Sequence, residues 1–204
     1  MSTITISRQM GSQGDELALQ VAQQLGWQLV ARDLINRAAS AAGLPHMALV
    51  DIDELGLLNL RPSAKEWQAY QTHVEGIIHA WAYRGEVVIA GRGGQMALRG
   101  WPDVFHIRVV APLEMRIARL QQKEKISAGS ARARLEASAK TRARYLQRCY
   151  GVQIDDPTLY HLTVNTGSLG LSQAVSLVIQ ASQAWFKVEC LGKEDMLRSE
   201  FQQE

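Results

Sequence analysis

The sequence predicts a three-layer α/β domain in which helices cover both faces of a five-stranded, mostly parallel sheet. Short strand-like segments alternate with segments of helical periodicity along the chain, as is typical of this class. Residues 86–90 are almost continuously apolar, and strands buried on both faces are typical of parallel sheets. With 204 residues, of which 47% are hydrophobic, the chain can form the core of one domain.

Five segments have the β-branched or apolar composition of strands. They are residues 3–7, 27–30, 86–90, 104–110 and 159–164. Because parallel strands run in the same direction, their carboxyl ends meet at one edge of the sheet. Ligands of open α/β folds bind at that edge. We therefore expect a site in the loops that follow the strands.

Helices are predicted between the strands by apolar residues at helical spacing. They are expected at residues 15–25, 33–42, 63–83, from 111 to the break expected at Gly129, 131–150 and 172–188. Ser63 and Glu66 have the spacing of a capping box at the start of the third helix. The aromatic residues of that helix, among them Trp67 and Tyr70, are expected in the core or at the interface of a homodimer.

Two stretches of the chain stand apart from this pattern. Residues 44–62 fit no element clearly, and the carboxylates of Asp51, Asp53 and Glu54 are expected in a solvated turn rather than at a metal. Residues 190–204 are polar and are expected to form a loosely attached tail. The domain is therefore predicted to span residues 1–189.

Basic residues are concentrated between Arg116 and Arg148, where ten lysines and arginines stand against two glutamates in a chain of net charge +2. Such a local excess indicates a polyanionic ligand, although solvated helix faces are also rich in Lys and Arg. Since the segment is helical, residues of about 120–150 are predicted to form a lid whose arginines close over phosphates.

The loop between the first strand and the first helix, residues 8–14, has the position of a phosphate-binding loop. It departs from the G-x-x-x-x-G-K-[ST] pattern: Arg8 and Gln13 stand at the glycine positions and Gly14 at the lysine. The loop therefore indicates either a phosphate site or a tight turn.

A second candidate is the sequence Gly91-Arg92-Gly93-Gly94, directly after the buried strand. It places Arg92 at the carboxyl edge of the sheet, where a guanidinium can bind a phosphate with two hydrogen bonds. The alternative is an exposed arginine in a flexible turn.

Five segments, in order and spacing, resemble the cytidylate kinase-like family. They are residues 4–14, 31–35, 88–93, 140–145 and 160–166, and the similarity covers residues 1–188. The resemblance implies a P-loop nucleoside-kinase fold with a degenerate P-loop and a helical lid. This chain has Asp15, Gly93 and Ala139 where members of the family or true cytidylate kinases carry a basic residue or an aspartate.

The resemblance also implies roles for individual residues. Arg8, Arg92 and Arg142 would be catalytic, and Arg92 would also bind the acceptor together with Arg32, Asp33 and Arg37. The residues that contact the nucleotide phosphates would be Gly11, Ser12, Gln13, Gly14, Asp15, Arg116 and Arg119. The cofactor would be ATP, with Mg²⁺ carried by the nucleotide rather than by a metal site of the protein.

The function expected from these features is ATP-dependent phosphoryl transfer to a nucleoside monophosphate or a similar small phosphate acceptor. Two alternatives stay open: a non-catalytic nucleotide sensor of the same fold, and a nucleic-acid-binding protein that uses residues 116–148. Cys149 and Cys190 form neither a disulfide framework nor a metal-binding pattern. No secretory signal or membrane-spanning run is visible, so we expect a cytoplasmic protein.

Overall fold

The computed structural model describes residues 2–43 and 63–201, with side chains up to Lys187. The strands are β1 (Thr3–Arg8), β2 (Gln28–Val30), β3 (Val87–Ala90), β4 (Val104–Val110) and β5 (Leu162–Asn165). The helices are α1 (Gly14–Leu25), α2 (Arg32–Ala41), α4 (Ala64–Arg84), α5 (Gly94–Ala97), α6 (Leu113–Glu124), α7 (Ala128–Tyr150) and α8 (Leu171–Phe201), with a 3-10 turn at Pro157–Leu159. The Asp51–Glu54 carboxylates lie outside the described residues.

The five strands form one sheet in the order β2-β3-β1-β4-β5, and every pairing is parallel. The predicted five-stranded sheet is thus confirmed. The central strand β1 lies between β3 and β4, with Ile4 opposite Val88 on one side and Phe105 on the other. As a result, the loops that follow β1 and β3 start from neighbouring points at the same edge.

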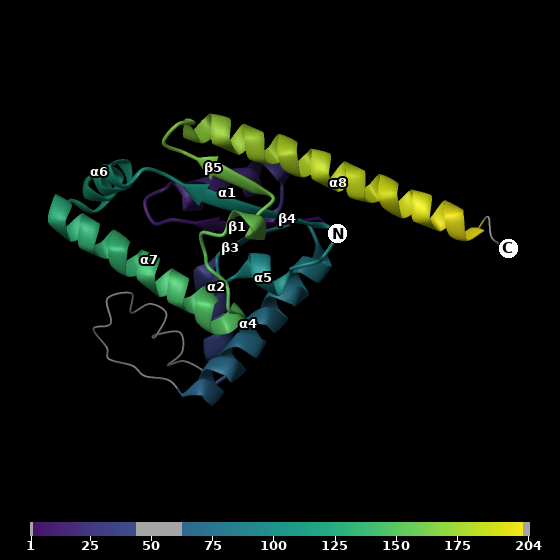
Figure 1. Ribbon diagram of the computed structural model, residues 1–204, viewed down its shortest axis with the longest axis horizontal. Coiled ribbons are helices and arrows are strands. Elements are labelled where there is room, and N and C mark those ends of the chain that lie inside the picture. Colours follow the sequence, from purple (N-terminus) through teal and green to yellow (C-terminus); the bar gives the residue numbers. More distant parts are fainter. Residues whose placement is uncertain (1, 44–62, 202–204) are drawn as a thin grey trace.

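A hydrophobic core lies on each face of the sheet, between the strands and the helices that cover them. One core joins α1 and α8 to one face of the sheet, through residues such as Leu17, Val21 and Val178. The other joins α2, α4 and the end of α7 to the opposite face, through residues such as Ile35, Tyr70 and Leu146. Figure 1 shows this arrangement, with α1 and α8 on one side of the strands and α2 and α4 on the other.

The helices α6 and α7 have a small core of their own. Ile117 and Leu120 of α6 pack on Ala131 and Leu135 of α7, and Met10 of the β1–α1 loop packs against this cluster. The predicted lid is therefore a helical hairpin, and Met10 is an apolar contact between it and the β1–α1 loop.

The break within this hairpin differs from the prediction. Gly129 lies in the first turn of α7, whereas α6 ends at Lys125, which adopts the left-handed conformation with φ 56°. The new helix begins because Ser127 caps it: its hydroxyl accepts a hydrogen bond from the Ser130 N–H at 3.2 Å. A glycine so close to a capped N-terminus does not stop a helix.

The last helix also differs, because α8 continues to Phe201 instead of ending at Val188. Residues 189–201 include three Glu and two Leu, which are good helix formers, and lack proline, so they allow the helix to continue. In Figure 1 the end of α8 extends beyond the sheet. No helix in the described part of the chain is long and apolar enough to cross a membrane.

A buried histidine lies in the centre of the sheet. His106 of β4 is 5% exposed, and its Nδ1 lies 2.8 Å from the Thr5 hydroxyl of β1. Its ring stacks on His161 with 4.9 Å between centroids. Burial, with a smaller contribution from His161, lowers the pKa of His106 from 6.5 to about 4.

This histidine makes stability depend on pH. Between pH 6.5 and pH 4 the unfolded chain protonates His106 and the folded chain does not, so stability falls as the pH falls through this range. From pH 7 to pH 4.5 we expect a loss of about 2–3 kcal/mol from this residue. Urea unfolding of the wild type and His106→Gln at both pH values measures it. An equally steep pH dependence in His106→Gln would contradict the assignment.

Candidate functional site

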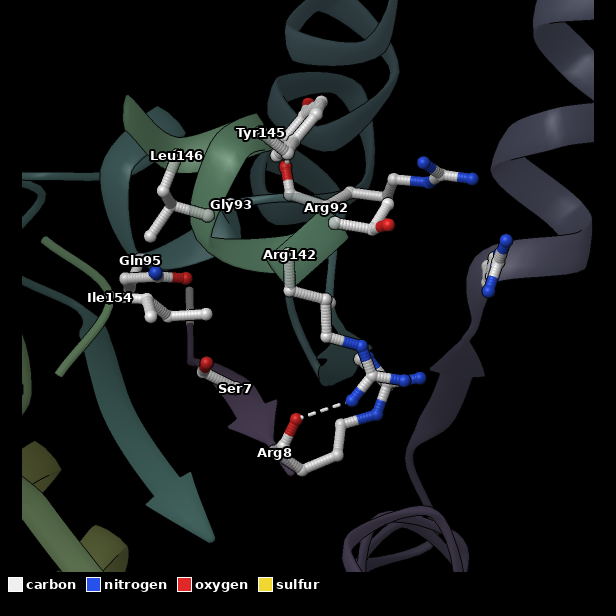
Figure 2. A pocket seen from close by; sticks show the side chains of 13 residues that line it. Ser7, Arg8, Arg92, Gly93, Gln95, Arg142, Tyr145, Leu146 and Ile154 are labelled. Atoms are coloured by element: carbon white, nitrogen blue, oxygen red, sulfur yellow. Dashed lines mark hydrogen bonds between the residues drawn. The ribbon is translucent and has the colours of Figure 1, made fainter. Parts of the chain in front are cut away.

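A cavity opens at the carboxyl edge of the sheet, where the β1–α1 and β3–α5 loops meet α2 and α7 (Figure 2). Four arginines line it: Arg8, Arg32, Arg92 and Arg142. Tyr145, Leu146 and Ile154 provide an apolar wall. Among the described residues that line this cavity there is no carboxylate. We call it the arginine pocket.

Arg92 is held in the pocket by strong local constraints. It adopts a left-handed conformation with φ 58°, between two glycines that also have positive φ, and it is 8% exposed. One of its Nη atoms donates a hydrogen bond to the side-chain oxygen of Asn36 on α2. The Tyr145 hydroxyl donates to its backbone carbonyl at 3.4 Å. The expected position of Arg92 at the sheet edge is confirmed, and it is not an exposed arginine in a flexible turn.

Arg142 connects the lid to the sheet. It projects from α7, and its Nη1 donates a hydrogen bond to the backbone carbonyl of Arg8 at 2.6 Å. Figure 2 shows the guanidinium groups of Arg142 and Arg8 close together at one end of the pocket, with Arg92 extending in another direction. Arg142 also lines the neighbouring cavity over the β1–α1 loop. It therefore lies between the loop and the arginine pocket.

The β1–α1 loop is folded tightly on itself. The Ser12 hydroxyl and backbone N–H both donate to the Gln9 carbonyl, at 2.8 and 3.2 Å. Gln13 caps α1 in a left-handed conformation with φ 60° and gives the helix no side-chain hydrogen bond. The first N–H groups of α1, from Gly14 onward, have no partner within the helix, and Gly14, Asp15 and Glu16 line the loop cavity.

Arg116 and Arg119 support the loop from α6. Arg119 donates to the hydroxyl and carbonyl of Thr166 at 3.1 and 2.8 Å, and the Thr166 hydroxyl in turn donates to the Ser12 carbonyl at 2.7 Å. Arg116 donates to the Ala111 carbonyl at 2.9 Å. Arg116 lines a cavity beside Met10, and Arg119 lines the loop cavity. Both residues hold backbone in place next to the loop.

Helix α2 brings only part of its predicted set to the pocket. Arg32 lines the pocket and Asn36, four residues later, reaches Arg92. Asp33 and Arg37 also lie four residues apart, but they occupy the adjacent, exposed face of the helix. Neither residue lines the arginine pocket.

Two residues of the site were not predicted from the sequence. Asn36 is only 7% exposed and has a neutral side chain, so no sequence pattern predicts that it belongs to the site. Arg108 is a 5% exposed cation within the apolar strand β4, and it donates to the Ser7 hydroxyl at 2.9 Å and to Asp155 at 2.6 Å. A charged residue inside an otherwise apolar strand is the signal that could have identified it.

The cations of the basic segment largely have partners within the protein. Arg132 pairs with Glu114 at 2.7 Å, Arg134 pairs with Glu124, and Lys123 pairs with Glu16 at 3.2 Å. These contacts, with those of the arginines described above, turn much of the positive charge toward the protein. They give little support to a nucleic-acid-binding surface on this segment.

Within the described part of the chain, no three or more His, Cys, Asp or Glu side chains lie together in a way that could hold a metal. Glu16, in the first turn of α1, pairs with Lys123 at 3.2 Å.

The fold is that of the P-loop kinases. The shikimate kinase of Acinetobacter baumannii, crystallised with shikimate, superposes with a TM-score of 0.53 and 12% identity over 90% of this chain and 94% of its own. An uncharacterized protein from Eubacterium ventriosum superposes with a TM-score of 0.73 and 17% identity over 90% of this chain and 99% of its own. At these identities the likeness shows the fold alone.

Within this class, the sequence identifies the family. The chain belongs to the cytidylate kinase-like family, whose model matches residues 3–168. It is 28% identical to the cytidylate kinase of Pyrobaculum aerophilum over 87% of this chain and 90% of that protein. It is also 28% identical to the cytidylate kinase of Halobacterium salinarum over 50% of this chain. That match covers 53%, or about half, of the length of the relative.

The strained conformation of Arg92 can be tested by stability. Alanine and glycine both remove the guanidinium, but only glycine adopts φ 58° without steric cost. Arg92→Gly is therefore expected to be more stable than Arg92→Ala by roughly 1 kcal/mol in urea unfolding. The same pair at Lys125, which is exposed and has φ 56°, calibrates the backbone effect. An Arg92→Ala variant at least as stable as Arg92→Gly would show that the positive φ is not imposed by the fold.

Proposed function

We propose that this protein transfers the terminal phosphoryl group of ATP to a nucleoside monophosphate or a similar small phosphate acceptor. The observation that carries the proposal is the arginine pocket beside the β1–α1 loop. Four arginines line it, and no lining residue among those described is a carboxylate, so the pocket would favour phosphate oxygens. The related cytidylate kinases support the nucleotide as the acceptor class.

The arrangement suits two phosphate positions. Arg8 and Arg142, next to the loop, would contact the phosphoryl group in transit, and Arg32 and Arg92 would hold the phosphate of the acceptor. The donor phosphates would bind at the N-terminus of α1, with backbone N–H groups from Gly14 onward. In this proposal Arg116 and Arg119 support the donor site through the loop instead of binding phosphate directly.

The reaction needs positioning and charge neutralisation more than a nucleophile on the protein. An oxygen of the acceptor phosphate attacks the γ-phosphorus, the bond from that phosphorus to its bridging oxygen breaks, and ADP leaves with the bonding electrons. No covalent intermediate with the protein is formed. The lid, through Arg142, covers the transfer position and limits the access of water.

A non-catalytic nucleotide sensor is the second candidate, because the loop has Gly14 where a lysine is usual and an acid, Asp15, beside it. Such a protein would bind nucleotide without making ADP.

The first experiment measures ADP formation with Mg-ATP and a panel of nucleoside monophosphates. Arg92→Ala is expected to lower kcat/KM for the acceptor by about 100-fold, because it removes a buried guanidinium that donates hydrogen bonds to the acceptor phosphate. Arg99→Ala is the matched control, since Arg99 is exposed and lies outside the pocket. No ADP with any acceptor, together with a melting temperature raised by ATP, would contradict the kinase and support the sensor.

The second experiment uses two arginines of the same helix. Arg142 reaches the end of β1, whereas Arg144 is exposed. Arg142→Ala is expected to lower kcat by about 100- to 1,000-fold, as in other enzymes that lose a hydrogen-bond donor to the transition state. Arg144→Ala is expected to leave kcat unchanged. Equal effects of the two substitutions would show that the lid acts only through its overall charge.

A further inference from the structure

The side chain of Arg8 follows a path that two glycines make available. It starts at the beginning of the β1–α1 loop, passes Gly14 and ends beside Gly91 of the neighbouring loop. A Cβ atom at Gly14 would lie 2.4 Å from the Arg8 Cβ, and one at Gly91 would lie 2.3 Å from the Arg8 Nη1. Both distances are far below van der Waals contact, so a side chain at either position would displace Arg8.

Asp15 holds this side chain from the solvent side. The Arg8 Nε donates a hydrogen bond to the Asp15 Oδ1 at 2.8 Å, with the arginine side chain 11% exposed and the aspartate 67% exposed. Burial alone would raise the pKa of Asp15, but the charge and hydrogen bond of Arg8, with Arg142 and Lys123, outweigh it and keep the pKa below its ordinary value. The carboxylate is therefore charged at neutral pH. It accepts from the Nε of Arg8, while the Arg8 Nη1 lies beside Gly91, which lines the arginine pocket.

In a standard P-loop, the lysine after the last glycine reaches back to the β- and γ-phosphates. Here Gly14 stands at that position, and the space above it contains the first part of the Arg8 side chain. The missing lysine and the presence of Arg8 are thus two aspects of one arrangement, because a side chain at residue 14 would collide with Arg8.

We propose that Arg8 supplies, from the start of the loop, the cation that a P-loop lysine supplies from its end, and that Asp15 is its positioning residue. This inference rests on the proposed phosphoryl transfer. Gly14 and Gly91 keep the path open, and Asp15 orients the guanidinium so that its Nη groups contact the transferred phosphoryl group together with Arg142. Asp15 then acts through Arg8, and it is not itself a contact of the nucleotide phosphates.

The opposite interpretation is that Asp15 is an acid that repels phosphate and merely suits the positive end of the helix dipole. The two interpretations predict opposite signs for Asp15→Asn, which keeps the shape of the side chain and removes its charge. If Asp15 repels phosphate, the Asp15→Asn variant should bind nucleotide more tightly than the wild type. If Asp15 positions Arg8, the variant should lose the contribution of Arg8.

The test combines Arg8→Ala and Asp15→Asn singly and together. We expect Arg8→Ala to lower kcat by about 100-fold. We expect Asp15→Asn to lower kcat by about tenfold, since a charge-assisted hydrogen bond orients the cation. The double variant should be no slower than Arg8→Ala. Tighter nucleotide binding or faster turnover in Asp15→Asn, or an undiminished effect of Asp15→Asn in the Arg8→Ala background, would overturn the proposal.

A second cycle tests the path itself. Gly91→Ala should displace the Arg8 guanidinium and lower kcat in the wild type, but have little further effect in Arg8→Ala. Gly100→Ala is the matched control, because Gly100 also has positive φ, +81° against +89°, and a Cβ there would meet no atom within 4 Å. An equal loss from Gly91→Ala in both backgrounds would show that backbone strain, rather than displacement of Arg8, causes it.

Binding of tripolyphosphate by calorimetry separates this inference from the proposed function. It needs no acceptor and no turnover, so it can be measured even if no nucleoside monophosphate yields ADP. Arg8→Ala and Asp15→Asn are each expected to weaken this binding by about three- to tenfold, without an additive effect in the double variant. Unchanged binding in Arg8→Ala would overturn the role of Arg8, whatever the result of the ADP assay.

Discussion

The parallel pairing of β1 with β3 determines where the candidate residues lie. Ile6 is opposite Ala90, so the chain leaves both strands at nearly the same level of the sheet. The two loops that follow are therefore neighbours, although they are far apart in the sequence. Arg8 and Gly91 come into contact for this reason, and the cavity between the loops is a consequence of strand register rather than of any one motif.

The site brings four arginines to the wall of one cavity. Their contacts differ in kind: Arg8 pairs with the carboxylate of Asp15, whereas Arg92 donates to the neutral side chain of Asn36 and Arg142 to the backbone carbonyl of Arg8. Neutral partners satisfy hydrogen bonds but leave the charge of the guanidinium in place. In the proposed function, an anion with several oxygens would neutralise that charge.

Much of the fold could be predicted from the sequence because its signals are local. Strand composition and helical periodicity depend on neighbouring residues, and Arg92 directly follows a strand whose end defines the ligand-binding edge. Asn36 and the path of Arg8 depend on contacts between segments that no local pattern contains. Asp33 and Arg37 were expected at the site from the family resemblance. Each lies one position along α2 from a residue of the pocket, Arg32 or Asn36, and one residue along a helix is enough to turn a side chain to the exposed face.

The end of α6 and the end of α8 could not be located for a different reason. A lysine in a left-handed conformation and a serine cap interrupt the lid, while the more obvious glycine lies within a helix. At the C-terminus the polar composition suggested a tail, but the stretch lacks proline, and helix α8 continues through Gly192 to Phe201.

The small core between α6 and α7 has a mechanical consequence. Its apolar contacts hold the two helices together, so a displacement of one is shared by the other. Met10 packs into that core from the β1–α1 loop, so the start of α7 is coupled to the loop. The far end of α7 is instead fixed in the core under the sheet by Tyr145 and Leu146. The two ends of this one helix are therefore anchored to different parts of the domain, and Arg142 lies between the two anchors.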